Sequence, residues 1–552
     1  MKKIILLSVL FCCIQLTHSQ TTTKATATNA RPKLVVGIVV DQMRWDFLYR
    51  YYDRYSKGGF KRLMNDGFAC ENTFIPYTPT VTAAGHTCVY TGSVPAIHGI
   101  VGNGFYDYTS NRELYCSEDK SVKTVGAANE NGQMSPKNML VTSVCDELKL
   151  ATNFRSKVIG IAIKDRGAIL PAGHSADAAY WYDSKSGNFI SSSFYFKNLQ
   201  LPKWTQDFNA SNAINKYYEK NWNTLYPINT YAQSDTDINT YESAPLGNDQ
   251  KGFPYDLKRF IDKKDFGKIR STPYGNSLTV DFAEAAVLNE KLGKDSITDF
   301  LTVSFSSTDY IGHAFGPNAV EVEDTYLRLD KDLEAFLAFL DKQVGANNYT
   351  VFLTADHGVA HVPGFLDKHN LPNGGVVGSK TDSILNAQLK QQFGVDSLCL
   401  GSWNYQFYLN HKLIKEKNLD QQKIIDYSIT LIQQVDGVER AFEYSKLPQT
   451  ILPNTLKDMF TNGYYPSRCG DIMVILKPGY IDDEYNSKGT THGIWSPYDA
   501  HIPLLFYGYG INKGKLYDKV YMTDIAATIS ALLHIQMPSG CIGNVIKEAI
   551  KK

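Results

Sequence analysis

The sequence predicts an α/β fold with a largely parallel central sheet and helices on both of its faces. The continuous apolar run 34–40, flanked by polar residues, is typical of a strand buried on both faces of such a sheet, and three further apolar-rich runs repeat this strand pattern: 158–163, 299–305 and 349–354. Segments with helical patterns separate these runs. Polar residues, mostly Asp and His, recur just beyond the runs, and this edge of an open α/β sheet is where ligands bind.

The elements after the first run can be expected in chain order. An amphipathic segment at about 46–64 predicts a helix that stops at Gly67. The next segment, 76–86, passes from proline and β-branched residues into small residues. We therefore expect a strand or loop to give way to a helix at Thr82.

The C-terminal part continues the alternation. Further strands are expected at 471–476 and 502–507, and a closing helix at 523–533 with Thr523 as its cap. Two long stretches interrupt the pattern, at about 170–270 and 365–470. We interpret them as large insertions over the ligand-binding edge, within a single domain that spans 33–552.

The N-terminus resembles a secretory signal. Lys2 and Lys3 precede an apolar run, 4–16, that is too short to span a bilayer. We predict a signal peptide at 1–19, a flexible leader at 20–32 and a periplasmic or secreted protein. No later stretch is long and apolar enough for a membrane span.

Composition narrows the function classes. The 552 residues include 56 basic and 56 acidic side chains, and this balance argues against a nucleic-acid-binding protein or a polybasic membrane anchor. Seven cysteines remain after the signal peptide, so at least one thiol is free. No C-x-x-C pair is present, which argues against a thiolate zinc finger. We expect a monomer.

Thr82 is the candidate nucleophile. At a helix start, free N–H groups and the helix dipole attract an anion. A hydroxyl there could attack a bound phosphate or sulfate if its proton were removed. The plainer alternative is a capping threonine.

Six residues form a candidate metal site. Asp309 and His313 are one helical turn apart, and Asp356 and His357 follow a buried run. Asp41 ends the first run, and His492 lies in a glycine-flanked loop. Each alone has a plainer explanation, such as a turn residue. Together, three carboxylates and three imidazoles suit zinc, although manganese and iron stay open.

These residues carry a resemblance to the alkaline phosphatase superfamily, in order and in approximate spacing. The matching motifs are Asp41, Thr80-Val81-Thr82, Asp309-x-x-x-His313, Asp356-His357-Gly358 and Thr491-His492-Gly493. Within the superfamily, the chain is similar to the PafA-type, phosphate-irrepressible alkaline phosphatases of exported bacterial enzymes. The resemblance covers most of the chain, from about residue 34 to the C-terminus.

The resemblance implies an alkaline-phosphatase-like catalytic domain with two Zn²⁺ ions. One zinc would be held by Asp309, His313 and His492. The other would be held by Asp41, Asp356, His357 and the Thr82 oxygen. Thr82 would then form a phosphothreonine that water hydrolyses.

Three further residues bear on the choice of ester. Lys164 and Arg166, which end the second run, would share one strand face and point together into the site. A monoester dianion offers three free oxygens to such a pair, and the amide of Asn103 could donate to one of them. In the family resembled, Asn, Lys and Arg at these positions mark monoesterases. The expected substrates are therefore small-molecule phosphate monoesters, without nucleic-acid specificity.

Two alternatives stay open. A phosphodiesterase or nucleotide pyrophosphatase would share every metal ligand, and a non-catalytic surface protein could keep zinc for structure. A sulfatase fits less well, because the sulfatases of this superfamily carry a modified Cys or Ser where this chain has Thr82.

Overall fold

The computed structural model describes residues 31–483 and 488–551. The predicted signal peptide, 1–19, and residues 20–30 of the predicted leader lie outside the described residues. Among the described helices, none combines the length and the hydrophobicity that a membrane crossing requires. Within the described chain all seven cysteines are free thiols.

Five parallel strands form the middle of a ten-stranded central sheet. In sheet order they are β8 (Ala178–Asp183), β7 (Val158–Ala162), β10 (Asp299–Phe305), β1 (Leu34–Val40) and β11 (Tyr349–Thr354). Every residue of these strands is buried, as expected of strands covered on both faces. The predicted α/β class with a parallel core is confirmed, and four of the five strands correspond to the four apolar runs.

Mostly antiparallel strands extend this core on both sides. Beyond β8 lie β9 (Asn188–Ser192) and β6 (Thr124–Val125), and beyond β11 lie β19 (Leu504–Gly508), β2 (Phe68–Cys70) and β20 (Gly514–Leu516). Strands β8 and β9 thus carry the sheet into the stretch that begins at about residue 170.

The strand predicted at 502–507 is divided. Its first part, β18 (His501–Ile502), pairs with β3 (Thr73–Phe74), which also pairs with β21 (Val520–Tyr521). Its second part, β19, joins the central sheet. Pro503 lies between them and has no N–H to donate to a strand ladder, which accounts for the break.

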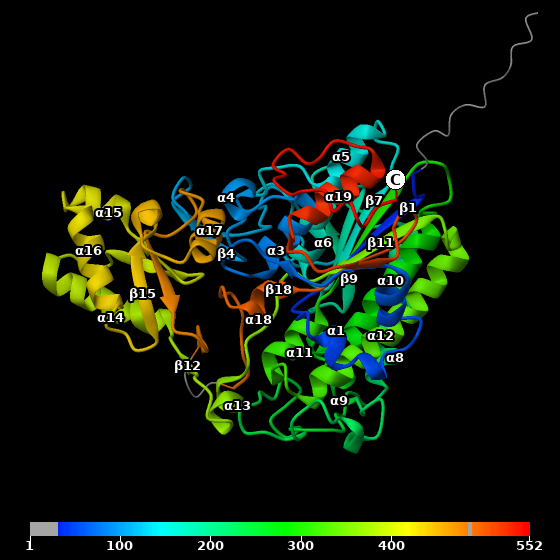
Figure 1. Ribbon diagram of the computed structural model, residues 1–552, viewed down its shortest axis with the longest axis horizontal. Helices are drawn as coiled ribbons and strands as arrows, with labels where there is room; N and C mark the ends of the chain where they lie inside the picture. Colours follow the sequence, from blue (N-terminus) through cyan, green and yellow to red (C-terminus); the bar gives the residue numbers. More distant parts are fainter. Residues whose placement is uncertain (1–30, 484–487, 552) are drawn as a thin grey trace, which may run out of the picture.

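Helices cover both faces of the central sheet, as Figure 1 shows. On one face lie α3 (Thr82–Thr91), α5 (Val144–Ala151), α6 (Asp165–Ala172) and α19 (Asp524–Leu533), and on the other lie α10 (Tyr274–Asn289) and α12 (Val320–Leu340). Helix α19 is the predicted closing helix. Thr523 precedes it at the cap position, but its side chain makes no capping hydrogen bond.

The long helix predicted at about 46–64 is wrong. The chain forms three short helices there: α1 (Phe47–Arg50), η1 (Tyr52–Arg54) and α2 (Phe60–Asp66). Gly58 and Gly59 separate the last two, and consecutive glycines disfavour a helix interior because of their backbone entropy. Gly67 follows α2 at its C-cap, as predicted.

A second, four-stranded sheet forms a lobe of its own, at the left of Figure 1. Its order is β13 (Cys399–Trp403), β14 (Gln406–Leu409), β16 (Ile472–Leu476) and β15 (Val438–Glu443). Helices α14 (Gly378–Phe393), α15 (His411–Glu416) and α16 (Gln421–Ile432) accompany it. The strand predicted at 471–476 is therefore present, but in this sheet rather than in the central one.

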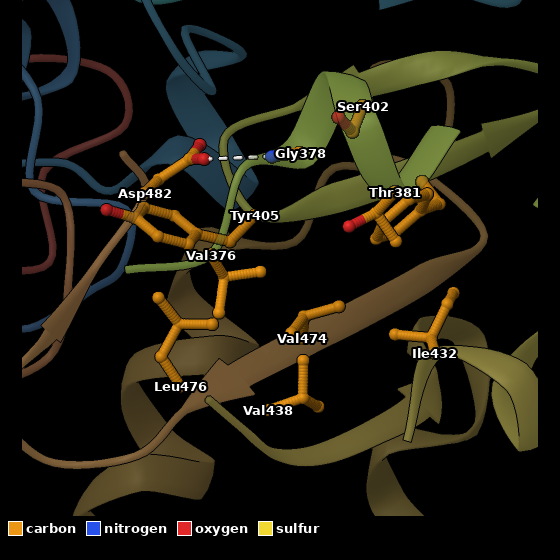
Figure 2. A pocket seen from close by; sticks show the side chains of 11 residues that line it. Val376, Gly378, Thr381, Ser402, Tyr405, Ile432, Val438, Val474, Leu476 and Asp482 are labelled. Atoms are coloured by element: carbon orange, nitrogen blue, oxygen red, sulfur yellow. Dashed lines mark hydrogen bonds between the residues drawn. The ribbon is translucent and has the colours of Figure 1, made fainter. Parts of the chain in front are cut away.

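Figure 2 shows a hollow in this lobe, where Val376, Val438, Val474 and Leu476 face one another. Its volume is about 30 Å³, room for about one water molecule. Its walls are mostly apolar. We regard it as part of the hydrophobic core of the lobe and not as a ligand site.

Short elements complete the described chain. Between the larger elements lie α4 (Pro95–His98), β4 (Gly104–Asp107), β5 (Arg112–Tyr115), α7 (Lys203–Ala210), α8 (Ala213–Tyr218), η2 (Ile228–Thr230), α9 (Arg259–Asp262), η3 (Phe266–Ser271), α11 (Ser307–Phe315), η4 (Asp341–Gly345), α13 (Pro363–Lys368), β12 (Gly374–Gly375), η5 (Tyr444–Gln449), α17 (Asn454–Gly463), β17 (Tyr480–Ile481) and α18 (Pro497–Ala500).

Candidate active site

Thr82 lies where an extended segment becomes α3. Val81 is extended, Thr82 is the first helical residue, and its side chain is almost fully buried. One free donor of the helix start, the N–H of Ala83, donates to Asn103 Oδ1 at 2.9 Å. The carbonyl end of the Asn103 amide is thereby occupied, so its NH₂ end remains for another acceptor. The predicted transition from extended chain to helix at Thr82 is confirmed.

Helix α3 comes very close to the end of β11. A Cβ added at Gly85 would lie 2.4 Å from the backbone oxygen of Asp356, so only glycine permits this approach. This packing brings the first turn of α3 beside the residues that follow β11. Thr82 Oγ1 is consequently 3.4 Å from His357 Nε2.

Three carboxylates come together at the carboxyl edge of the parallel strands. Asp41 follows β1, Asp356 follows β11 and Asp309 lies in the first turn of α11, which follows β10. All three are buried. Burial and the nearby charge of Asp356 raise the pKa of Asp41 well above its usual range, because both disfavour its anion. Within the described chain, Asp41 Oδ1 accepts no hydrogen bond, while Asp41 Oδ2 faces the ammonium of Lys164 at 2.7 Å and Asp356 Oδ2 faces His86 Nδ1 at 3.2 Å.

Main-chain carbonyls orient three imidazoles toward these carboxylates. His357 Nδ1 lies 2.9 Å from Gly358 O, His313 Nδ1 lies 2.7 Å from Thr490 O, and His492 Nδ1 lies 2.7 Å from Thr80 O. A carbonyl only accepts, so each Nδ1 carries the proton and donates it. Burial lowers the pKa of His357 and of His492, so each of these rings keeps a lone pair on Nε2, whereas the charge of Asp309 outweighs burial and raises the pKa of His313. This is the arrangement that a metal-binding histidine needs.

Among the described residues, two groups could each hold a metal ion: Asp41 with Asp356 and His357, and Asp309 with His357 and His492. The ligand atoms of each group lie within 4.8 Å of one another. The first group contains the three Asp and His members of one predicted set, which also included the Thr82 oxygen. The second has His357 in the place expected for His313. His313 is nevertheless adjacent, with its Nε2 3.3 Å from Asp309 Oδ1.

The donor set fits divalent cations. Three buried carboxylates this close together are costly unless cations neutralise them, and the single ammonium of Lys164 offsets only part of their charge. Mixed O and N donors suit zinc-like metals. The residues present therefore support metal binding, while the number and the identity of the ions are not fixed by the donors.

Lys164 extends its ammonium into this group of carboxylates. Its Nζ lies 2.7 Å from Asp41 Oδ2, 2.6 Å from Asp309 Oδ2 and 3.4 Å from Thr82 Oγ1. Burial opposes the charge, but Asp309 and Asp41 outweigh it and raise the pKa of Lys164. Lys164 is thus charged and directly beside the candidate nucleophile.

The strand geometry predicted for Lys164 and Arg166 is wrong. Strand β7 ends at Ala162, Lys164 is the N-cap of α6 and Arg166 lies in its first turn. Arg166 Nη1 donates to Tyr115 OH at 3.0 Å, and within the described chain its buried Nε donates to no acceptor. Arg166 therefore lines the same edge as Lys164, through a helix start rather than through a shared strand face.

The sequence reasoning missed Gln42. This buried residue has φ +67°, a conformation rare outside glycine. Its backbone N–H donates to Asp356 Oδ1 at 3.1 Å, and its Nε2 donates to Asp309 Oδ1 at 2.9 Å. Gln42 thus links two of the candidate ligands. A glutamine directly after the Asp41 strand end was the only signal in the sequence.

His86 contacts two of the candidate metal ligands, Thr82 and Asp356. Its Nδ1 lies 2.9 Å from Thr82 O and 3.2 Å from Asp356 Oδ2, and its Nε2 lies 2.8 Å from Ser304 Oγ. It contacts candidate ligands without itself belonging to either group of potential metal donors among the described residues.

A family model described as type I phosphodiesterase / nucleotide pyrophosphatase matches residues 35–495. This range covers most of the 552 residues, and the chain belongs to that family.

Within the family, the chain is a homologue of the alkaline phosphatases PhoV and PafA. PhoV of Synechococcus elongatus is 52% identical over 533 residues, which cover 95% of this chain and 94% of PhoV. PafA of Elizabethkingia meningoseptica is 49% identical over 530 residues, which cover 95% of this chain and 96% of PafA.

A crystal structure of alkaline phosphatase PafA matches with a TM-score of 0.91 and 48% identity, over 94% of this chain and 99% of that one. A protein of Myroides odoratus that is named a calcium-transporting ATPase is 50% identical over 524 residues, 95% of each chain.

These findings confirm the predicted relationship to PafA-type alkaline phosphatases and the predicted enzyme class, a phosphoric monoester hydrolase.

Proposed function

We propose that the protein is an exported di-zinc alkaline phosphatase that hydrolyses phosphate monoesters of broad specificity through a phosphothreonine at Thr82. The observation that carries this proposal is the contact of Thr82 Oγ1 with both Lys164 Nζ and His357 Nε2, beside two overlapping groups of metal donors. A nucleophile, a cation for the phosphoryl group and metal ligands are thereby gathered at one point.

Asp41, Asp356 and His357 would hold one zinc ion together with Thr82 Oγ1, and Asp309, His313 and His492 would hold the other. When bound, such ions lower the pKa of a coordinated hydroxyl and offset charge on the attacking and leaving oxygens. The position of His313 Nε2, 3.3 Å from Asp309 Oδ1, and the contact of its Nδ1 with Thr490 O support the assignment of His313 to the second ion.

Other side chains of the site would then bind the phosphoryl group of the substrate. If Asp41 and Asp309 held cations, Lys164 would share these partners with them, and its ammonium would be available to the phosphoryl oxygens. Arg166 offers its buried Nε, which has no acceptor within the described chain, and Asn103 offers its NH₂, since its Oδ1 is occupied by the N–H of Ala83. Three donors match the three free oxygens of a monoester dianion.

Thr82 Oγ1 would attack phosphorus, forming a new O–P bond as the ester O–P bond breaks and the alcohol leaves. Water then attacks the phosphothreonine and returns the Thr82 hydroxyl and inorganic phosphate. Since these contacts address only the phosphoryl group, many alcohols could serve as leaving groups, which supports broad specificity. Export rests on the basic and apolar pattern of residues 1–19.

The name of the family model favours a second candidate, a phosphodiesterase or nucleotide pyrophosphatase. Such an enzyme would need the same metal donors. It would gain less from Lys164 and Arg166, because a diester has one free oxygen fewer and less charge.

The double variant Lys164→Ala/Arg166→Ala tests the choice. We expect kcat/KM for phenyl phosphate to fall by about 1,000-fold or more, since two charge-assisted contacts are lost, and kcat/KM for a bis-aryl phosphate to change much less. Both are measured on the same preparations. Equal losses for the two esters would favour the diesterase.

A further inference from the structure

A pocket of about 190 Å³ adjoins the proposed phosphoryl-binding side chains. Lys164, Asp165 and Arg166 form one wall, Trp181 and Tyr182 of β8 form another, and Arg270 with Tyr310 closes a third. We propose that this pocket receives the leaving group of the phosphate monoester, and that Arg270 recognises an acidic substituent on it. The inference rests on the proposed phosphatase function and names a preferred class of substrate.

Arg270 has no anionic partner within the part of the chain that the structure describes. It lies on the short helix η3, and its guanidinium stacks on the Tyr310 ring, with Cζ 4.8 Å from the ring centroid. Among the described residues it has neither an ion pair nor a hydrogen bond, although its side chain is half-buried. A guanidinium carries five N–H donors in a planar fork that matches a carboxylate or a phosphate.

The other charges of the pocket also favour an anion. Lys164 lies over the same Tyr310 ring, with Nζ 5.3 Å from its centroid, and Arg166 is its neighbour on the pocket wall. Asp165 is the acidic residue among the lining side chains. Its Oδ1 already accepts from Tyr115 OH at 2.6 Å and from the N–H of Arg166 at 2.6 Å. Among the lining side chains, three cations thus face one engaged carboxylate, and Lys164 is also paired with Asp41 and Asp309 outside the lining.

The aromatic wall supplies an apolar surface. Trp181 Nε1 donates to Asn131 O at 3.0 Å, and Tyr182 OH donates to Phe266 O at 2.9 Å. Their polar atoms are satisfied by the main chain, and the small part of each residue that stays exposed, 2% of Trp181 and 6% of Tyr182, offers carbon to a ligand. The pocket therefore suits a short carbon skeleton between two anionic ends: the reacting phosphoryl group at Lys164 and Arg166, and a carboxylate or a second phosphate at Arg270.

Matched substrates test the inference. Phenyl phosphate is compared with carboxyphenyl phosphate, and the monophosphate of propane-1,3-diol with its bisphosphate. The wild-type protein should prefer the acidic member of each pair. Arg270→Met should lower kcat/KM for the acidic members by about 10- to 100-fold, the range of one charge-assisted contact, and leave phenyl phosphate within about twofold.

Two further variants serve as controls. Arg270→Lys keeps the charge and should restore part of the preference. Arg259→Met removes another arginine of the same stretch, one that pairs with Asp249 away from the pocket, and should change neither substrate. Equal losses for acidic and neutral substrates, or no loss for either, would overturn the proposed role of Arg270.

A binding measurement separates this inference from the proposed function. Calorimetric titration with 3-phosphonopropionate and with propylphosphonate, neither of which is hydrolysed, should give tighter binding of the former, and Arg270→Met should abolish the difference. If the wild-type protein hydrolysed no phosphate ester, the proposed function would fail. If it hydrolysed phenyl phosphate but bound both phosphonates equally, only the role of Arg270 would fail.

Discussion

The side chain of Thr82 is the point at which the proposed chemistry begins. Its hydroxyl has two polar neighbours at 3.4 Å, Lys164 Nζ and His357 Nε2. Lys164 Nζ is a hydrogen-bond donor. His357 Nε2 presents a lone pair, because the proton of this ring is on Nδ1, where it is donated in a hydrogen bond to Gly358 O. The ammonium of Lys164 would therefore stabilise a deprotonated Thr82 on one side. On the other side, Thr82 Oγ1 and His357 Nε2 could bind the same metal ion.

Acid quenching during turnover should trap one phosphoryl group on the peptide that contains Thr82, and mass spectrometry can locate it. Thr82→Ser should still be labelled, because it keeps a hydroxyl in the same place. Thr82→Val should not be labelled and should lose at least about 1,000-fold in kcat/KM, since a nucleophile is removed. A phosphoryl group on any other residue would contradict the assignment.

A second residue, His98, allows a prediction of how the stability of the protein changes at acidic pH. It is fully buried in α4, and its Nδ1 accepts the N–H of Ile100 at 3.1 Å. Burial and the charge of Arg468 lower the pKa of His98 from 6.5 to about 3. Because the folded state then binds a proton less readily than the unfolded state, His98 favours folding fully above pH 6.5, and this contribution falls as the pH drops toward 3.

Urea unfolding between pH 5 and 7 measures this contribution. The free energy of unfolding of the wild-type protein should fall more steeply with decreasing pH than that of His98→Asn, by about 1.4 kcal/mol per pH unit below 6.5. Asparagine can still accept from Ile100 but does not titrate. Parallel pH profiles for the two proteins would show that His98 is not buried in its neutral form.

At the scale of elements, one hairpin connects the second sheet to the candidate site. The two-residue turn between β13 and β14 has left-handed residues at both positions, Asn404 at φ +55° and Tyr405 at φ +64°. Asn404 Nδ2 donates to Gly104 O at 2.9 Å, and Tyr405 OH donates to His492 O at 3.1 Å. The turn thus contacts the chain next to Asn103 and the loop of His492.

Tyr405→Phe should lower kcat/KM by about 2- to 10-fold and make the enzyme easier to inactivate with a chelator, because the His492 loop loses one anchor worth about 1 kcal/mol. Tyr408→Phe is the matched control. Its hydroxyl also donates to a backbone oxygen, that of Arg468 at 3.0 Å, but away from the candidate ligands. It should lose similar stability and keep its activity. Equal chelator sensitivity in both variants would contradict the anchoring role.

The elements differ in how well the sequence predicts them. A run of buried apolar residues indicates a strand with little ambiguity, and 34–40, 299–305 and 349–354 are strands with these bounds. Such a run does not say which sheet it joins, and Ile472–Leu476 pairs in the smaller sheet because its partners come from a lobe that the pattern does not reveal.

The features of the candidate site also differ in how well the sequence predicts them. Carboxylates at the ends of parallel strands converge because the sheet brings those ends together, so the meeting of Asp41, Asp309 and Asp356 follows from the predicted fold. The helical start at Lys164 and the left-handed conformation of Gln42 depend on local backbone geometry that single residues do not encode. The contacts of Tyr405 depend on a long-range packing of two sheets.

At the scale of the whole molecule, a neutral chain concentrates opposite charges at one edge of the sheet. Three carboxylates, Lys164 and Arg166 meet there, although residues 41 and 492 lie near opposite ends of the sequence. Buried carboxylates this close together repel one another, and bound cations would relieve the repulsion. The charge distribution of the fold and the proposed catalysis thus involve the same group of side chains.

The most direct measurement is X-ray anomalous scattering at the zinc edge from crystals of the purified protein. Our account predicts two peaks beside Thr82, one among Asp41, Asp356 and His357 and the other among Asp309, His313 and His492. The absence of any peak at this edge of the sheet from crystals of active enzyme, or the dispersal of these six side chains away from Thr82, would contradict it.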